Sequence, residues 1–303
     1  MIGVESTKEQ ELEINPRWIV VATSTFYPKW YPGKVKKHDI VDKVRGDLAI
    51  EMFREATLKG YQVIVVDHGE SPESFKTELT KVGVTPQFGG DLSMTARRQQ
   101  AFREASKLEG VRVICYAEPE KVSIVRDCLP DAVLPLIQGK ADIVIPKRDE
   151  TAFRTYPNYQ VEYEKRGNRL WNTLLREHNL MPKDAEDLDV WFGPRFFRND
   201  PNILNLFLRR YEFKKRQLKL DQIVDLTLWP NSIFLPVVAA LHEGFRVLGV
   251  NVPYKNPTEQ TRIETDSQGF RRKRDIQYKS LIISTIHFIK MFENNSRSRI
   301  KSV

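Results

Sequence analysis

Apolar and polar positions along the first half of the chain follow two alternating patterns. Continuous runs rich in β-branched residues predict four strands, at 18–25, 62–71, 111–121 and 141–148, and each run closes on polar residues. Between them, apolar residues recur with helical spacing at 47–59, where Asp47 is the expected N-cap, and at 95–107. Buried strands that alternate with helices predict an α/β fold, with a mostly parallel sheet covered by helices on both faces.

The second half of the chain is less regular. Helices are expected near 168–178, 202–210 and 232–242, a turn at 193–198 and a strand at 246–252. A polar loop at 253–275 precedes a final amphipathic helix at 276–292. We divide the chain into a mobile leader (1–16), two halves (17–150 and 151–275) and a C-terminal helix with a basic tail (276–303).

Composition narrows the class of protein. The 303 residues are 41% apolar, which is enough for a substantial core, and they carry a net charge of +8. The charge suits an anionic partner such as nucleotide phosphates, an acidic lipid surface or nucleic acid, but it selects none of them. Cys115 and Cys128 give neither a disulfide framework nor a metal-binding spacing. With no apolar run of transmembrane length and no signal-peptide pattern, a cytoplasmic location is expected.

Polar side chains gather where the predicted strands end, and ligands of open parallel sheets bind beyond these ends. Thr23 and Ser24 close the first strand, Asp67 and Gly69 close the second, and Glu118 and Glu120 close the third. Ordinary turn chemistry is the alternative for Asp67, because Asp and Gly are common turn residues. For the two glutamates, the alternative is a solvated turn in which Glu120 caps the next helix.

Several segments carry a family resemblance in the same order along the chain. They are Val65–Ser71, similar to a "VVDDGS" turn; Gly90 with Ala96-Arg97-Arg98; Glu118-Pro119-Glu120, at the place of a metal-binding "DxD"; Ala141–Val144 with Arg148; Phe192–Arg198; and Pro236–Val247. The chain thus resembles the GT-A-fold glycosyltransferases. The resemblance implies a Rossmann-type, mostly parallel sheet with a smaller acceptor-side subdomain, and an enzyme that transfers a sugar from a nucleoside-diphosphate sugar.

The resemblance also implies roles for individual residues. Nucleotide binding falls to Thr23, Ser24, Asp67, Gly69, Arg97 and Arg98. Glu118 and Glu120 would act in catalysis and hold Mn²⁺ or Mg²⁺. The sugar and its acceptor would contact Trp191, Gly193, Trp229 and Asn231. The alternatives are a charged helix face for the two arginines and a core position for the tryptophans.

Two departures from the family pattern bear on mechanism. Pro119 stiffens the turn between the glutamates, and Lys121 follows at once as an ion-pair partner that would compete with a metal ion. Asn256 stands near the place where the family carries a late metal-binding histidine. Both a metal-dependent and a metal-free enzyme therefore stay open. No carboxylate stands at 228–232, which favours a retaining mechanism. That points to the mannosylglycerate-synthase-like branch, with mannose as the candidate sugar and Arg195, Tyr254 and Lys255 positioning the reacting groups.

Other functions and partners are weighed on specific segments. A nucleotidyltransferase needs a glycine-rich "GxGTR" loop after the first strand, which residues 23–27 do not match, and a catalytically silent nucleotide-binding protein is the third reading. The basic cluster at 271–274 and the apolar helix that follows fit either a docked helix or peripheral membrane contact with a lipid-linked acceptor. Nucleic acid is not expected as a partner, because no recognised binding module is present.

Overall fold

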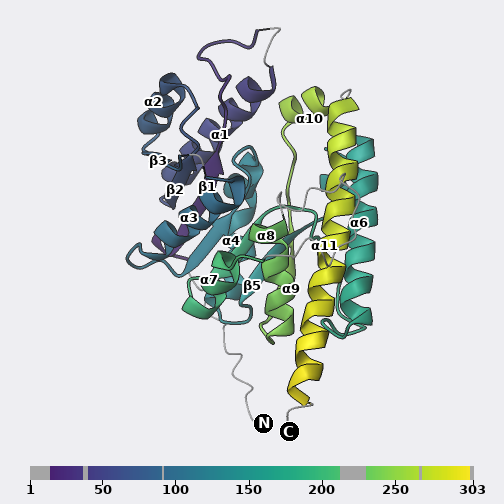
Figure 1. Cartoon of the computed structure of the whole chain (residues 1–303). Coiled ribbons are helices and arrows are strands. Elements are labelled where there is room, and N and C mark those ends of the chain that lie inside the picture. The colour runs from purple at the N-terminus through teal and green to yellow at the C-terminus, as the bar shows by residue number, and fades with distance from the viewer. Residues whose placement is uncertain (1–13, 37–39, 91, 212–229, 266–267, 301–303) are drawn as a thin grey trace, which may run out of the picture.

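A single sheet forms the centre of the computed structural model, which describes residues 14–36, 40–90, 92–211, 230–265 and 268–300 (Figure 1). Its strands run in the order β3-β2-β1-β4-β6-β5-β7. Their bounds are β1 (Ile19–Thr25), β2 (Gln62–Asp67), β3 (Gln87–Phe88), β4 (Val113–Tyr116), β5 (Ile143–Arg148), β6 (Arg195–Arg198) and β7 (Val247–Val252). Strands from both predicted halves of the chain therefore share one sheet.

The sheet is parallel except at β6, which pairs antiparallel with β4 on one side and with β5 on the other. The pairs of β1 with β2 and β4, of β2 with β3 and of β5 with β7 are all parallel. The predicted α/β class with a mostly parallel sheet is thus confirmed. The carboxyl ends of β1, β2 and β4 meet at the same edge, which is where the sequence places its candidate site.

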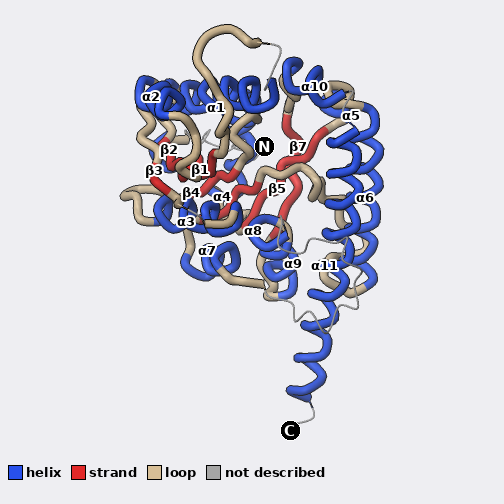
Figure 2. Tube along the Cα trace, turned by 45° about the horizontal axis from the view of Figure 1, so that its top comes forward, coloured by secondary structure: helices blue, strands red, loops and turns tan. Residues whose placement is uncertain are grey.

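Helices cover both faces of the sheet (Figure 2). On one face, α1 (Ile40–Leu58), α2 (Glu73–Lys81) and α4 (Leu129–Ile137) share a core with Ile19 and Val21 of β1. On the other face, α3 (Met94–Ser106), α7 (Pro201–Leu208) and α9 (Leu235–His242) share a core with Val20 and Ala22. Successive strand residues enter opposite cores because side chains alternate along a strand.

A long helical pair flanks the second core. α6 (Asn158–Glu177) and α11 (Gln268–Ile300) run side by side, and Trp171 Nε1 donates to Thr285 Oγ1 over 3.0 Å (Figure 1). Leu281, Phe288 and Ile289 of α11 are buried. The described apolar face of this helix therefore packs against the protein. The shorter elements are a 3₁₀ turn (Pro16–Trp18), a π-helical turn (Ile124–Cys128), α5 (Glu150–Phe153), α8 (Pro230–Ile233) and α10 (Thr258–Thr265).

Three element assignments made from the sequence are wrong. The first helix begins at Ile40 instead of Asp47, so Asp47 lies inside it and accepts hydrogen bonds from Trp30 Nε1 at 2.9 Å and Lys43 Nζ at 2.6 Å. Residues 253–275 contain α10 and the first turns of α11, which begins at Gln268 instead of residue 276, so they do not form a continuous loop. The expected turn at 193–198 contains strand β6, which inserts between β4 and β5.

Candidate functional site

The turn after β2 is organised by the carboxylate of Asp67. Asp67 is 2% exposed, and its Oδ2 accepts hydrogen bonds from the hydroxyls of Thr25 and Ser71, each over 2.7 Å. Its Oδ1 accepts the N–H of Gly69 over 2.8 Å, and Gly69 turns the chain at a φ of 99°. Asp67 thus accepts three hydrogen bonds that hold the turn in shape. This is what we expect if Asp67 is an ordinary turn residue.

Thr23 and Ser24 lie on opposite faces of β1. Thr23 is fully buried, and its hydroxyl donates to the carbonyl of Ala117 over 2.7 Å, which ties β1 to the chain leaving β4. Ser24 is half-buried and shares the face of Val20 and Ala22, where α3 packs. Ser24 is therefore the better placed of the two to meet a ligand.

The first turn of α3 brings Arg97 and Arg98 to this edge. Ser93 caps the helix, and Arg97 donates to the carbonyl of Leu92 while its guanidinium lies 5.9 Å from the ring centre of Phe26. Burial and the charge of Arg98 lower the pKa of Arg97 against the opposing effects of Asp67 and Glu70. Arg98 donates to the hydroxyl of Ser232 over 3.3 Å.

Two exposed aromatic rings beside this turn were not anticipated from the sequence. Phe26 is 44% exposed and its ring centre lies 4.6 Å from that of His68. Phe88 is 74% exposed and lies against Gly69, where a Cβ would stand 2.2 Å from the ring. Large exposed apolar groups that cluster in one place are unusual and mark binding surfaces.

Glu118 and Gly193, both predicted for the site, lie in contact. A Cβ at Gly193 would stand 1.7 Å from Glu118 Oε1, so only glycine leaves room for this carboxylate. Glu118 Oε2 is buried and, among the described residues, has no hydrogen-bond partner. A buried carboxylate oxygen without a partner is costly, and a substrate hydroxyl would satisfy it.

Glu120 points into a network that sequence analysis missed. Its Oε1 lies 3.8 Å from Arg45 Nη1, and its Oε2 lies 3.5 Å from the hydroxyl of Tyr27. Arg45 also binds Glu264 of α10 through Nη2 at 2.5 Å. Burial alone would lower the pKa of Arg45, but Glu120 and Glu264 raise it above its usual value. The link joins α1 to α10 across 219 residues of sequence, so no local pattern announces it.

Lys121 is buried beside the same carboxylates. Its Nζ lies 5.9, 5.3 and 5.7 Å from the ring centres of Tyr156, Phe192 and Tyr254. Burial alone would lower the pKa of Lys121, but Tyr156, Glu118 and Glu120 raise it, so the ammonium stays charged. Tyr254 is buried as well, and its hydroxyl donates to Asn256 Oδ1 over 3.2 Å. The fold thus brings Tyr254 and Lys121 together, a contact that the sequence does not predict.

Arg195 and Trp191 have their polar groups inside the protein. Arg195 is fully buried and donates to four main-chain carbonyls, those of Val190, Phe192, Pro194 and Ile233. Burial lowers its pKa to about 10. Direct substrate contact by Arg195 does not fit this geometry, and the residue instead braces the loop before β6. Trp191 is buried and stacks on Tyr278, with the ring centres 5.9 Å apart. This position agrees with the alternative that Trp191 is a core residue.

The remaining predicted residues lie at the limits of the described chain. Trp229 falls outside the described residues, and so do Asp221 and Asp225, the carboxylates that precede the 228–232 segment in the sequence. Asn231 belongs to α8, but its side chain is not described. The segment at 228–232, on which the retaining mechanism rests, is thus not tested by the structure.

A divalent cation held by both glutamates does not fit the residues present. Glu118 Oε2 is buried and has no hydrogen-bond partner among the described residues, whereas Oε1 of Glu120 lies beside Arg45 and Oε2 of Glu120 beside Tyr27. Asn256 uses its side-chain amide on Thr261, at 2.8 Å, and its carbonyl oxygen on Tyr254. Among the described residues, no group of three His, Cys, Asp or Glu side chains has metal-binding geometry.

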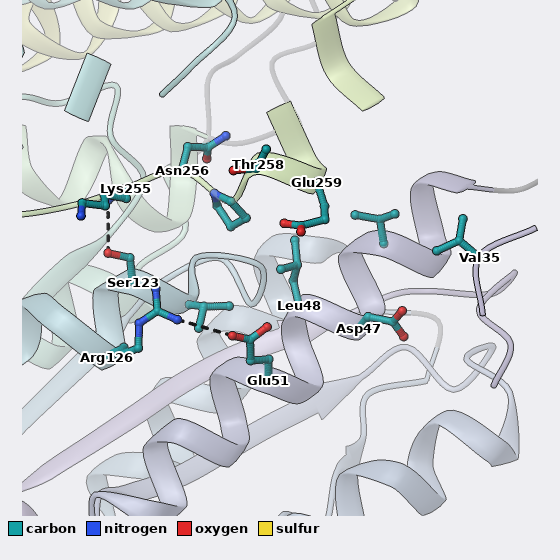
Figure 3. A pocket seen from close by; sticks show the side chains of 13 residues that line it. Val35, Asp47, Leu48, Glu51, Ser123, Arg126, Lys255, Asn256, Thr258 and Glu259 are labelled. Carbon is teal, nitrogen blue, oxygen red and sulfur yellow. Dashed lines mark hydrogen bonds and ion pairs between the residues drawn. The ribbon is translucent and has the colours of Figure 1, made fainter. Parts of the chain in front are cut away.

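A recess of about 500 Å³ opens beside this cluster (Figure 3). It lies between α1, the turn after β4 and the chain entering α10, and its walls include Asp47, Glu51, Arg126 and Lys255. Among the residues predicted for the site, Lys255 alone lines it, and the Lys255 N–H donates to Ser123 Oγ over 3.1 Å. The recess is mixed in charge and large enough for a small polar molecule.

Comparisons with known proteins find similar solved structures but no matching sequence family. The sequence matches no protein-family model and no curated protein. Similar solved structures include 4-diphosphocytidyl-2C-methyl-D-erythritol synthase from Anaerococcus prevotii DSM 20548, at 11% identity over 88% of this chain and 100% of that one, with a TM-score of 0.40. A protein assigned as a nucleotide-diphospho-sugar transferase from Desulfovibrio desulfuricans G20 shares 14% identity over 91% and 98%, with a TM-score of 0.36. A cytidylyltransferase from Leptospira borgpetersenii shares 12% identity over 93% and 95%, with a TM-score of 0.40. Likenesses this distant carry no conclusion about the activity of this chain.

Within the described residues, no helix is both long enough and apolar enough to cross a membrane.

Proposed function

We propose that this protein is a glycosyltransferase that takes a nucleoside-diphosphate sugar as donor and a hydroxyl compound as acceptor. The observation that carries the proposal is the gathering of charged groups at the carboxyl ends of β1, β2 and β4. Glu118, Glu120, Lys121 and Arg45 meet there, beyond one edge of the sheet, and the Asp67 turn and Arg97 lie at the neighbouring strands. A donor that spans from a base to a sugar needs an extended site of this kind.

The two ends of the edge suit different parts of a donor. The Asp67 turn, with Phe26, Phe88 and Arg97 around it, offers apolar faces and a cation to a nucleotide. Glu118, with its unpartnered oxygen, offers an acceptor to a sugar hydroxyl. The recess beside Lys255 is the candidate place for the acceptor molecule. We further propose retention of anomeric configuration, because no carboxylate stands at 228–232 to serve as base.

The runner-up is nucleotidyl transfer, and the two reactions release different products. The purified protein is incubated with a panel of nucleotide sugars and, separately, with nucleoside triphosphates and sugar phosphates. Release of a nucleoside diphosphate supports glycosyl transfer, whereas release of pyrophosphate supports nucleotidyl transfer. Proton NMR of the first-formed glycoside from an α-linked donor is expected to show an α linkage.

Glu118→Gln keeps the shape of the side chain and removes its charge. We expect turnover to fall by a factor on the order of 100, because the oxygen that faces the sugar loses its charge. Glu73→Gln, on an exposed side chain at the start of α2, serves as the matched control. Equal activity in the two variants would show that the charge of Glu118 plays no part in the reaction.

A further inference from the structure

One end of the molecule is built from three segments that are far apart in the sequence. The loop between β1 and α1, the helix α10 and the first turns of α11 lie together there (Figure 1). Val35 of the loop and Glu259 of α10 line the same recess. Arg45 of α1 binds Glu264 of α10 at 2.5 Å, and its guanidinium lies 5.6 Å from the ring centre of Phe270 in α11. The three segments therefore contribute to one surface.

This surface carries many more cations than carboxylates. Among the described residues 31–36, 258–265 and 268–274, the only exposed carboxylate is that of Glu259, because Glu264 is buried and belongs to an ion pair inside the protein. The exposed cations of these segments are Lys34, Lys36, Arg262, Arg271, Arg272 and Lys273. A solvent-facing excess of positive charge on one surface attracts an anionic partner.

Two exposed valines stand among these cations. Val35 lies between Lys34 and Lys36 in the loop and is 47% exposed, and Val41, in the first turn of α1, is 37% exposed. Cations beside apolar side chains suit a lipid surface, where the cations meet anionic headgroups and the apolar groups enter the boundary with the acyl chains. A nucleic acid would gain little from the valines, because they offer no ring on which a base could stack.

The loop presents Val35 in a defined conformation. The Lys36 N–H donates to the hydroxyl of Tyr31 over 2.6 Å, and the Lys36 ammonium lies 5.3 Å from the centre of the same ring. A Cβ added at Gly33 would meet no atom within 4 Å, so the tip of the loop projects into solvent. A projecting tip can reach a layer of headgroups without any change in the fold.

We propose that this end of the protein binds an anionic membrane surface through the loop at 31–36, α10 and the first turns of α11. The cations supply most of the attraction, since each Lys or Arg near such a surface strengthens binding by about fivefold. The apolar side chains of α11 that the sequence offers to a membrane, such as Leu281 and Ile289, are buried and take no part. A membrane bound in this way would face the recess that Val35 and Glu259 line. The proposal does not depend on the activity proposed above.

Vesicles of phosphatidylcholine with about 30% phosphatidylglycerol are the probe, and binding of the full-length protein is measured by co-sedimentation at several salt concentrations. We expect binding that weakens as salt rises, and no binding to pure phosphatidylcholine. Lys34→Gln combined with Lys36→Gln should weaken binding on the order of 20-fold and leaves the main-chain bond to Tyr31 intact. Lys59→Gln combined with Lys107→Gln, an equal charge change at the C-terminal ends of α1 and α3, should weaken it by less than about threefold.

A second pair of variants tests the apolar contact at constant charge. Val35→Ser should weaken binding to the anionic vesicles by about threefold. Leu58→Ser, at a side chain that is 77% exposed at the C-terminal end of α1, should leave it unchanged.

Three results would overturn the proposal. The first is no binding to the anionic vesicles at low salt. The second is equal weakening by the two pairs of lysine variants, which would indicate a diffuse effect of net charge. The third is tighter binding of an RNA or DNA oligonucleotide than of the vesicles together with no effect of Val35→Ser, which would assign the surface to nucleic acid.

Discussion

At the scale of single residues, several polar groups predicted to bind a ligand are used to build the site. Asp67, Thr23 and Arg195 each form hydrogen bonds within the protein, to a turn, a neighbouring strand end and a loop respectively. Such residues position the site without necessarily touching substrate. Sequence places them correctly at strand ends, but it does not reveal which partner each polar atom finds.

Asp67→Ala should destabilise the protein as well as weaken nucleotide binding. The change leaves the hydroxyls of Thr25 and Ser71 and the N–H of Gly69 without their shared acceptor. We expect the free energy of unfolding to fall by about 2–4 kcal/mol, measured by urea denaturation. Glu70→Ala in the same turn should lower the free energy of unfolding by less than about 0.5 kcal/mol, because that side chain is largely exposed. Equal losses in the two variants would show that the Asp67 hydrogen bonds contribute little.

The candidate site could be predicted in part. The strand-end residues Glu118 and Glu120 and the loop residue Gly193 were expected at one edge, and the structure brings Glu118 and Gly193 into contact. Arg45 and Tyr27 were missed, because their partners lie far away in sequence and no periodic pattern records such pairs.

At the scale of elements, the sequence predicted strands well where β-branched runs are long. β1, β2 and β5 each span six or seven residues of such a run. β3 and β6 span two and four residues, too few for a period to emerge, and they owe their structure to pairing with neighbours. α1 was predicted too short, because Gly46 inside it reads as a loop residue although tertiary packing requires it.

Gly46→Ala tests this explanation of α1. Alanine favours a helix over glycine by about 1 kcal/mol, but here its Cβ would stand 2.3 Å from Trp30 Cδ1. We expect the clash to prevail and the protein to lose about 1–3 kcal/mol of stability, measured by thermal and urea denaturation. In a Trp30→Leu background the same change should become neutral or stabilising. A stabilising effect in the wild-type background would contradict the close packing of Trp30 on α1.

At the scale of the whole molecule, a buried ionic network joins β5 to α6 and to the loop before β6. Arg148 binds Asp189 through Nε at 2.8 Å and Glu164 through Nη1 at 2.6 Å. Burial alone would raise the pKa of Asp189, but Arg148 and Asn168 lower it below its usual value. A carboxylate whose pKa is depressed in the folded state stabilises the protein above its unfolded pKa, and this contribution is lost as the pH falls.

Asp189→Asn should therefore reduce the stability of the folded protein most near neutral pH. We expect a loss of about 3–5 kcal/mol at pH 7, since one partner of a buried ion pair is removed. Below about pH 4 the carboxylate takes up a proton in the unfolded state before it does so in the folded state, so the stability difference between wild type and variant should narrow as the pH falls. Asp184→Asn, on an exposed position of the same loop, is the control and should cost less than about 0.5 kcal/mol at either pH. A pH-independent difference would mean that Asp189 acts through packing alone.

The ion pair between Arg45 and Glu264 has a consequence for biosynthesis. Its partners are 219 residues apart, and the first of them leaves the ribosome long before the second. Similarly, one edge of β4 stays unpaired until β6 has been synthesised. A nascent chain would therefore pass through a long interval with an incomplete sheet and with Arg45 lacking its Glu264 partner. Ribosome-bound fragments that end before α10 are expected to show no binding of a nucleoside diphosphate, so function would begin only when nearly the whole chain has been made.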